Sequence, residues 1–369
     1  MSTSQPNPLA ARWIGSSPIR IWGLPPAERL RRTLTRVGLG DAGPWTGSPS
    51  PPALLLLLGD HVYDDALVAA LTKAPGTVVV VHGCPVAAHV PRELAEHMAL
   101  ALTGDAAIPE GLAQAKPDDL VATHRTKLRK RQPSFVLPVT AETARQVEDH
   151  LFAASYKGVT DAVTKYAWPR PAKSVTRWCV ALGVSPNAVT LVSLVLAVLA
   201  IVLFYDAKLW AGLACAWGMT FLDTVDGKLA RVTLTSSKLG DALDHGLDLI
   251  HPPIWWWAWW AGTGSQDTIA LAVVLAGYVF LRLQEGFFLW RFGIEMHVWQ
   301  RFDSRFRLVT ARRNPILVIL TVALALGEPA LGFHISAAWT LLSLAVHTAR
   351  ILKAARTAAG QHLSSWLAA

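Results

Sequence analysis

Hydrophobic and polar positions are distributed very differently in the two halves of the chain. As far as about Arg177, short apolar runs alternate with amphipathic stretches, and charged residues are frequent. Beyond that point, long apolar stretches follow one another and the charges gather in a few short clusters. A helix needs about 20 apolar residues to cross a bilayer, and these stretches reach that length. The pattern therefore predicts a soluble N-terminal region followed by a membrane region.

The N-terminal region shows the pattern of strands that alternate with helices. Strands are expected at 19–23, 53–58, 77–82 and 134–139, and helices at 26–37, 62–73, 91–102 and 140–155. This alternation favours an α/β fold with a largely parallel sheet. Residues 40–52, rich in Gly, Pro and Ser, are expected to form a loop. The first residues are polar, so we expect no cleaved signal peptide and a cytoplasmic location for this region.

The membrane region, residues 185–369, is predicted to be all-α with six transmembrane helices. The expected spans are 188–206, 209–227, 240–262, 267–288, 314–332 and 335–354. The links near Ala207, Gly262 and Pro329 carry almost no Arg, whereas the other links and the C-terminal part are strongly basic. Because positive charge marks the cytoplasmic side, both termini are predicted to be cytoplasmic in a multi-pass protein of the inner (cell) membrane.

Four smaller features add to this picture. The amphipathic linker 151–184 is predicted to be a helix, either in the membrane interface or packed between the domains. The Trp-rich run 255–260 favours an interfacial aromatic belt, with a ligand cage as the alternative. The net charge of +8 follows from the topology, so no nucleic-acid partner is expected. Three scattered cysteines without a CxxC pair indicate neither disulfides nor a zinc site.

Four carboxylates lie at helical spacing inside the most hydrophobic part of the sequence. The stretch reads Asp223-x-x-Asp226-Gly227-x-x-Ala230-Arg231, then eight residues, then Gly240-x-x-x-Asp244-x-x-x-Asp248. Residues three or four apart share a helix face, and charges at membrane depth mark an ion path or a reaction site. Converging carboxylates repel one another unless a hard cation such as Mg²⁺, Mn²⁺ or Ca²⁺ joins them. A cation transporter and a metal-dependent enzyme are both compatible with this array.

At every fixed position and gap, this stretch matches the signature of the CDP-alcohol phosphotransferase family, which the chain resembles over about 157–355. The start of the first span, Ser185-Pro186-Asn187-x-x-Thr190, is also similar to that family. The resemblance implies that the hydroxyl of an acceptor alcohol attacks the β-phosphorus of a CDP-alcohol and that CMP leaves. It also implies one or two Mg²⁺ or Mn²⁺ ions and a homodimer. The transporter hypothesis gives no reason for the glycines, Ala230 and Arg231 at these gaps.

The family's chemistry implies a role for each residue of the signature. Asp223, Asp226 and Asp244 would bind metal, and Asp248, beside the same ions, would be the general base. The residues implied at the nucleotide are Asn187, Gly227, Ala230, Arg231 and Gly240. The two glycines would remove side chains where the nucleotide approaches, and Arg231 would pair with a phosphate.

The acceptor site is expected among arginines outside the signature. The candidates for a phosphate pocket are Arg282, Arg305, Arg307, Arg312 and Arg313. The alternative is that the last four only set the topology, and that Arg282 forms a buried pair with Glu285. His297 and His334 are expected to be ordinary interfacial residues. The donor is expected to be CDP-diacylglycerol and the acceptor inositol phosphate or glycerol phosphate, in phospholipid biosynthesis; a CDP-inositol-type donor that yields a phosphodiester is the alternative.

The N-terminal region resembles sugar nucleotidyltransferases in residues 23–39 (GLPPAERLRRTLTRVGL) and 55–67 (LLLLGDHVYDDAL). Asp60 falls at that family's metal-ligand position. Residues 1–18, however, offer only Gly15-Ser16-Ser17 where the family has a Gly-rich basic loop, so a triphosphate has no backbone cradle. We therefore expect residues 1–150 to form an inactive nucleotidyltransferase-like domain in which Asp60 ends a strand or caps a helix. A binding or regulatory role for this domain is compatible with that expectation.

Overall fold

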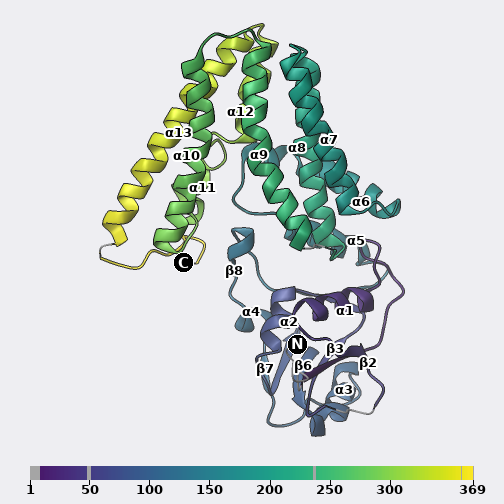
Figure 1. Cartoon of the computed structure of the whole chain (residues 1–369). Coiled ribbons are helices and arrows are strands. Elements are labelled where there is room, and N and C mark those ends of the chain that lie inside the picture. Colours follow the sequence, from purple (N-terminus) through teal and green to yellow (C-terminus); the bar gives the residue numbers. More distant parts are fainter. Residues whose placement is uncertain (1–8, 48–50, 236–237, 359, 369) are drawn as a thin grey trace, which may run out of the picture. The chain divides into compact units, whose positions relative to one another are not determined.

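The computed structural model describes residues 9–47, 51–235, 238–358 and 360–368; within the helix Lys238–Gly262 (α9), side chains are described at 246 and from 249 onward. The chain forms two compact units. The first comprises Met1–Arg125, Arg131–Ser155 and Val232–Leu234, and the second Thr126–Lys130, Tyr156–Arg231 and Thr235–Ala369. Figure 1 shows that the first is a mixed α/β structure and that the second is helical.

A mixed sheet of six strands organises the first unit. The strands in spatial order are β2 (Ala42–Pro44), β1 (Leu9–Ile14), β3 (Ala53–Leu58), β6 (Cys84–Pro91), β5 (Thr77–Val81) and β7 (Ala113–Ala115). Strand β1 runs parallel to β2 and β3, and β7 runs parallel to β5, whereas β6 is antiparallel to both of its neighbours. The other short strands are β4 (His61–Tyr63), β8 (His124–Arg125), β9 (Lys130–Arg131) and β10 (Val136–Pro138).

Helices cover both faces of this sheet because the apolar residues of its central strands alternate between them. Leu55 and Leu57 of β3 pack with α1 (Pro26–Arg36) and α2 (Asp65–Leu71). Leu54 and Leu56 pack on the other face with α3 (Ala95–Thr103). The period of two places successive leucines on opposite faces, so the four consecutive leucines at 54–57 can all be buried. Two further helices of this unit are α4 (Pro117–Leu120) and α5 (Ala144–Ala154).

The prediction of a largely parallel sheet is wrong because β6 makes the sheet mixed. The chain reverses after β5 through His82 and Gly83, both at positive φ (52° and 85°). A two-residue turn of this kind matches the twist of antiparallel strands and forms a hairpin. The strand expected at 19–23 is also wrong, since only an isolated bridge joins Ile21 and Leu24 there.

Several helices of the first unit begin later than predicted, at Asp65, Ala95 and Ala144 in place of 62, 91 and 140. The helix expected from residue 62 begins only at Asp65, after β4, because the side chain of Asp64 caps it by accepting a hydrogen bond from the backbone N–H of Ala66 at 3.1 Å. Asp60 lies in the turn that follows β3, where its Oδ1 is 2.7 Å from Nδ1 of His61. It is therefore at a strand end, one of the two structural positions expected for it.

The second unit consists of helices that run alongside one another (Figure 1). In chain order they are a π-helical turn (Val163–Ala167), α6 (Pro169–Ala181), α7 (Pro186–Tyr205), α8 (Leu209–Val232), α9, α10 (Thr268–Phe292), η4 (Met296–Val298), α11 (Arg301–Phe306), α12 (Arg313–Ala325) and α13 (Pro329–Ala358). Ser185 starts α7 as its N-cap, with its Oγ accepting from the backbone N–H of Ala188 at 3.2 Å. The link after α12 lies at 326–328, so the expected boundary between the last two spans at 332–335 is wrong.

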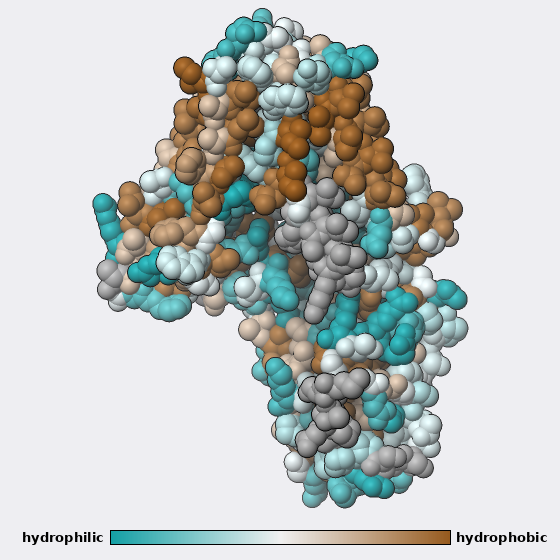
Figure 2. Space-filling view, viewed as in Figure 1, coloured by the Kyte–Doolittle hydropathy of each residue, from teal (hydrophilic) through white to brown (hydrophobic). Residues whose placement is uncertain are grey.

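Three of these helices, α7, α10 and α13, are long and apolar enough to cross a membrane, judged over the described part of the chain. Helix α12 is apolar but shorter. Large hydrophobic side chains such as Leu191, Phe280 and Leu341 are exposed on the long helices, and Figure 2 shows hydrophobic surface over their outward faces. An exposed apolar surface of this extent suits contact with lipid.

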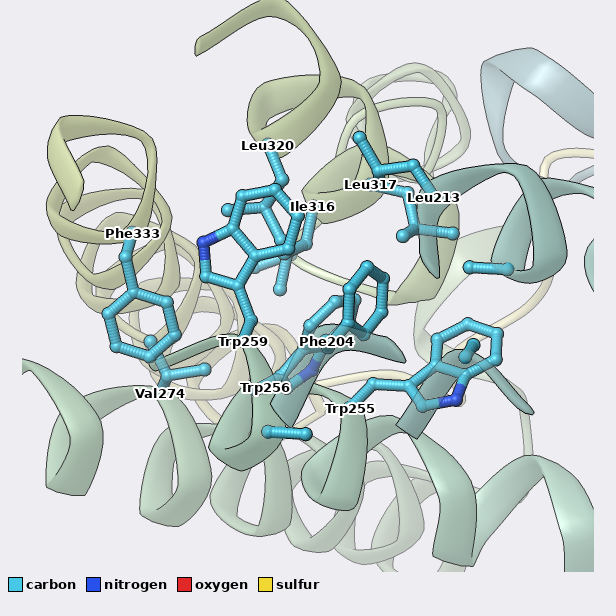
Figure 3. Packing of buried hydrophobic residues seen from close by; sticks show 14 of the residues in the cluster. Phe204, Leu213, Trp255, Trp256, Trp259, Val274, Ile316, Leu317, Leu320 and Phe333 are labelled. Atoms are coloured by element: carbon cyan, nitrogen blue, oxygen red, sulfur yellow. The ribbon is translucent and has the colours of Figure 1, made fainter. Parts of the chain in front are cut away.

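The tryptophans of α9 contribute to the core of the helical unit. Trp255, Trp256 and Trp259 are fully buried and lie among apolar side chains of α7, α12 and α13 (Figure 3). The indole Nε1 of Trp255 donates to the carbonyl of Ala197 at 2.9 Å, and that of Trp259 donates to Pro329 at 3.3 Å. These bonds satisfy the polar edge of each ring inside the core. The interfacial belt expected for this run is therefore wrong for these three residues.

Close packing of α9 against α7 makes Gly262 difficult to replace. A Cβ at this position would lie 1.7 Å from the carbonyl oxygen of Phe204, whereas a Cβ at Gly286 would meet nothing within 4 Å. We expect Gly262→Ala to lower the free energy of unfolding by about 1–3 kcal/mol through overpacking. Gly286→Ala is the matched control and should be neutral or slightly stabilising, because Ala favours helix more than Gly. Thermal unfolding of the detergent-solubilised variants, followed by circular dichroism, measures this; equal midpoints would contradict the close approach.

Candidate active site

A pocket of about 420 Å³ lies within the helical unit. Its wall is formed by α8, α9, α10, residues 156–164 and the residues around the start of α12. The basic side chains that line it are Arg129, Lys157, Lys228, Arg231, Arg282, Arg307, Arg312 and Arg313. Only two acidic residues, Asp161 and Asp223, belong to the described lining. This excess of positive charge favours a ligand with several negative charges, such as a pyrophosphate.

Helix α8 brings three signature residues to this pocket. Asp223, Gly227 and Arg231 are four residues apart, so they form one stripe along the helix, and all three line the pocket. Nη2 of Arg313 donates to Oδ2 of Asp223 at 2.6 Å. A Cβ added at Gly227 would lie 3.1 Å from Nη2 of Arg231, so the glycine leaves room for that guanidinium beside the helix.

Two other signature residues, and Asn187 at the start of α7, do not belong to the pocket lining. Asp226 is buried, and its Oδ2 accepts a hydrogen bond from Oγ1 of Thr190 on α7 at 2.6 Å. Ala230 is half-buried outside the lining, and Asn187 is exposed in the first turn of α7. The similarity of the start of α7 to the family therefore has a structural counterpart at Thr190, which contacts a signature carboxylate. Asn187 shows no such contact in the described structure.

Gly240, Asp244 and Asp248 belong to α9, but their side chains lie outside the described residues. Two neighbouring residues on the same helix, Leu249 and Pro252, line the pocket. The structure thus brings α9 to the pocket, and the roles of these three signature residues stay predictions.

Most of the predicted acceptor residues converge on the same pocket. Arg282, Arg312 and Arg313 line it, and so does Arg307, which is buried. Arg305 is exposed and lies outside the lining. It stands two residues before Arg307, and residues two apart on a helix point in nearly opposite directions. The structure therefore separates one predicted arginine from the other candidates.

Glu285 of α10 connects two of these arginines. Its Oε1 accepts hydrogen bonds from Nη2 of Arg282 and from Nε2 of His297, each at 3.0 Å, and its Oε2 accepts from Nη2 of Arg312. His297 is buried, so its interpretation as an ordinary interfacial residue is wrong. His334, in contrast, is partly exposed and pairs with Asp267 at 2.9 Å. Glu285 and Arg312 are 27 positions apart, so no helical or strand spacing in the sequence could predict their pairing.

Asp161 is a pocket residue that the sequence pattern did not single out. Its Oδ1 accepts from the backbone N–H of Thr164 and from Nδ2 of Asn314, each at 3.0 Å. Burial alone would raise the pKa of Asp161, but the charge of Arg307 and these hydrogen bonds bring it below its ordinary value. Burial, together with the charge of Arg312, lowers the pKa of Arg307, which Asp161 partly opposes. The pocket thus holds a buried cation next to a buried, ionised carboxylate.

The state of His297 gives a testable pH dependence. Burial lowers its pKa to about 3, although Glu285 opposes this. The pKa of an unfolded His is about 6.5, so the unfolded chain binds the extra proton between pH 6.5 and 3 and stability falls as pH drops through this window. In this window the free energy of unfolding changes by up to ~1.4 kcal/mol per pH unit. We expect His297→Gln to reduce the pH dependence of the free energy of unfolding between pH 6.5 and 4.5, measured by denaturant titration; an unchanged slope would contradict a neutral, buried imidazole.

Known proteins are similar to the helical region of this chain. A family model described as CDP-alcohol phosphatidyltransferase matches residues 183–351. Cholinephosphotransferase 1 of Xenopus laevis is 32% identical over 124 residues, which is 31% of this chain and 30% of that protein. Phosphatidylinositol phosphate synthase of Mycobacterium marinum is 28% identical over 116 residues, 31% of this chain and 50% of that protein. The match therefore spans half of these relatives or less.

A solved structure of a related enzyme aligns with a similar share of the chain. The crystal structure of Mycobacterium tuberculosis phosphatidylinositol phosphate synthase in apo form covers 48% of this chain and 95% of its own, at 18% identity and a TM-score of 0.38. The family match includes α8 and its pocket residues Asp223, Gly227 and Arg231. Over residues 183–351, the chain therefore contains a CDP-alcohol phosphatidyltransferase domain.

Proposed function

We propose that this chain transfers a substituted phosphate group from a CDP-alcohol to the hydroxyl of an acceptor alcohol and releases CMP. The observation that carries the proposal is the signature stripe Asp223, Gly227 and Arg231 on the wall of a strongly basic pocket. Its volume of about 420 Å³ falls in the range of small-molecule sites. The basic lining suits the pyrophosphate of the donor, which carries negative charge on both of its phosphates.

The described residues fit a divalent metal bound by oxygen ligands. The carboxylate of Asp223 reaches the pocket and already accommodates a positive partner, Arg313. Carboxylate oxygens are the ligands that Mg²⁺ and Mn²⁺ prefer. We propose that Asp223, Asp226, Asp244 and Asp248 hold one or two such ions. When bound, the metal would neutralise the charge that develops on the pyrophosphate.

The proposed transfer is a single displacement at phosphorus. The acceptor oxygen forms a bond to the β-phosphorus, the bond from that phosphorus to the oxygen bridging to CMP breaks, and CMP leaves with the electron pair. Asp248 would take the proton of the acceptor hydroxyl. Arg231 and its basic neighbours would hold the phosphate oxygens. Contacts of the nucleotide with Asn187, Gly227, Ala230 and Gly240 are proposed from the signature alone.

The donor and acceptor are proposed from the chemistry around the pocket. Exposed apolar helices would keep the site at a membrane, where CDP-diacylglycerol is present. The converging arginines favour an anionic acceptor such as inositol phosphate or glycerol phosphate. A CDP-inositol-type donor that forms a phosphodiester is the second candidate. A cation transporter is the distant alternative, and it gives no reason for the glycines, Ala230 and Arg231 at the gaps of the signature.

We propose the following arrangement in the cell. The helical region crosses the inner (cell) membrane six times with both termini in the cytoplasm, and three helices already have the length and composition for this. A homodimer through the membrane helices is the proposed assembly. The nucleotidyltransferase-like nature of residues 1–150 stays a prediction.

Substitution of two carboxylates separates their proposed roles. Asp223→Asn should weaken Mn²⁺ binding and abolish turnover, because it removes a charged oxygen ligand. Asp248→Asn should retain nucleotide binding and most metal binding, and lose about 10²–10⁴-fold in turnover, because it removes the base. Purified protein with Mg²⁺ and either CDP-diacylglycerol or CDP-inositol would be offered a panel of phosphorylated alcohols, and CMP would be measured. Wild-type rates of CMP release in either variant would contradict the assignment, and metal flux without CMP release would favour the transporter.

A further inference from the structure

Glu285 stands behind the wall of the pocket and does not line it. The two arginines that it contacts, Arg282 and Arg312, do line the pocket. The Glu285 side chain is 17% exposed, slightly less than Arg282 at 22% and Arg312 at 23%. The carboxylate can therefore bind both guanidiniums on the side away from the cavity, while the arginines themselves line it. Its third donor, His297, is 5% exposed and closes the cluster on the buried side.

These contacts restrict side chains that are flexible when unbound. A guanidinium held by a carboxylate is fixed in position and orientation, so less conformational freedom remains to be lost when it binds an anion. Because burial lowers the pKa of His297 to about 3, its ring is neutral near pH 7 and adds no charge to the cluster. Glu285 thus binds two cations without neutralising the pocket, whose described lining keeps its excess of basic residues.

The pocket also contains guanidinium donors that have no hydrogen-bond partner among the described protein groups. Within the described residues, Nε and Nη1 of Arg307 and Nε of Arg312 are buried without a hydrogen-bond partner. Arg307 is 6% exposed and lines the same pocket. A buried, unsatisfied donor is costly, and an anionic oxygen in the cavity would remove that cost.

We propose that Glu285 is a positioning residue that holds Arg282 and Arg312 in place to bind a phosphate group of the substrate, next to Arg307. The proposal deepens the proposed function, on which it rests for the identity of the substrate. Glu285 touches neither the phosphate nor the reacting atoms. It acts through the two arginines.

A metal site is the competing interpretation of the same cluster. Ligand atoms of Glu285, His297 and His347 all lie within 4.8 Å of one another. However, Glu285 already accepts hydrogen bonds from two guanidiniums, and Arg307 lies near enough to lower the pKa of His297. A dication would be repelled by all three charges. The charge balance therefore favours an anion in front of the cluster over a metal inside it.

Binding of inorganic phosphate to the purified full-length protein tests the proposal without any assumption about catalysis. Glu285→Gln removes a negative charge from a basic region, so simple electrostatics predicts tighter phosphate binding. The positioning role predicts the opposite, a loss of about tenfold, because the arginines lose their anchor. Glu328→Gln, the same substitution at an exposed site, is the matched control and should bind as the wild type does. Isothermal titration calorimetry measures the dissociation constants.

A double variant shows whether Glu285 acts through Arg312. If it does, Glu285→Gln should weaken phosphate binding less in the Arg312→Gln background than in the wild type, because one of the two anchored arginines is already absent. Glu285→Asp keeps the charge and shortens the side chain, and it should also weaken binding; this variant serves if Glu285→Gln does not fold. Unchanged or tighter phosphate binding in the folded Glu285 variants overturns the proposal. It is also overturned if the wild type binds one equivalent of zinc and His347→Ala no longer binds it. If the wild type binds phosphate as predicted but releases no CMP from any donor, the proposed function is contradicted, whereas the positioning role of Glu285 is not.

Discussion

The structure of the helical unit depends on the pairing of charges that have been taken out of water. An isolated buried charge is very costly, and a partner of opposite sign offsets that cost. Asp223 pairs with Arg313, and Glu285 with Arg282 and Arg312. These pairs connect α8 and α10 to the start of α12, so the same contacts that satisfy the charges also build the pocket. Removal of one partner leaves the other charge uncompensated, which couples the stability of this region to its chemistry.

Among the described residues that line this pocket, the basic side chains outnumber the acidic ones, and the proposed function gives that imbalance a meaning. A purely structural network would be expected to balance its charges, because each unpaired guanidinium raises the cost of folding. Here Arg307 is buried with donors that no described residue accepts. The missing negative charge is what the phosphates of a CDP-alcohol and a phosphorylated acceptor would supply. On this proposal, the bound substrate supplies the negative charge that balances the basic side chains of the described lining.

The sequence pattern was sufficient where a local periodicity carried the information. The continuous apolar run 53–58 predicted the buried strand β3, and the helical spacing of the signature predicted the helix that carries Asp223 and Asp226. The pattern failed where long-range packing decided the outcome. The tryptophans of α9 resemble an interfacial belt by composition, and only the neighbouring helices show that they fill a core. Likewise, the hairpin of β5 and β6 depends on a turn at His82 and Gly83. The contact of Glu285 with Arg312 depends on how the chain folds back between α10 and α12.

The family match covers the helical region, and the relatives share only part of their length with this chain. The reaction is thus the central claim, and the route of one oxygen atom tests it most directly. Purified protein would be given Mg²⁺, CDP-diacylglycerol and glycerol phosphate labelled with ¹⁸O in its free hydroxyls, and the products followed by ³¹P NMR. The account predicts CMP without label and an equal amount of a new phosphodiester with ¹⁸O in the bridging position. Unlabelled product, or donor cleavage in which water supplies the oxygen, would contradict it.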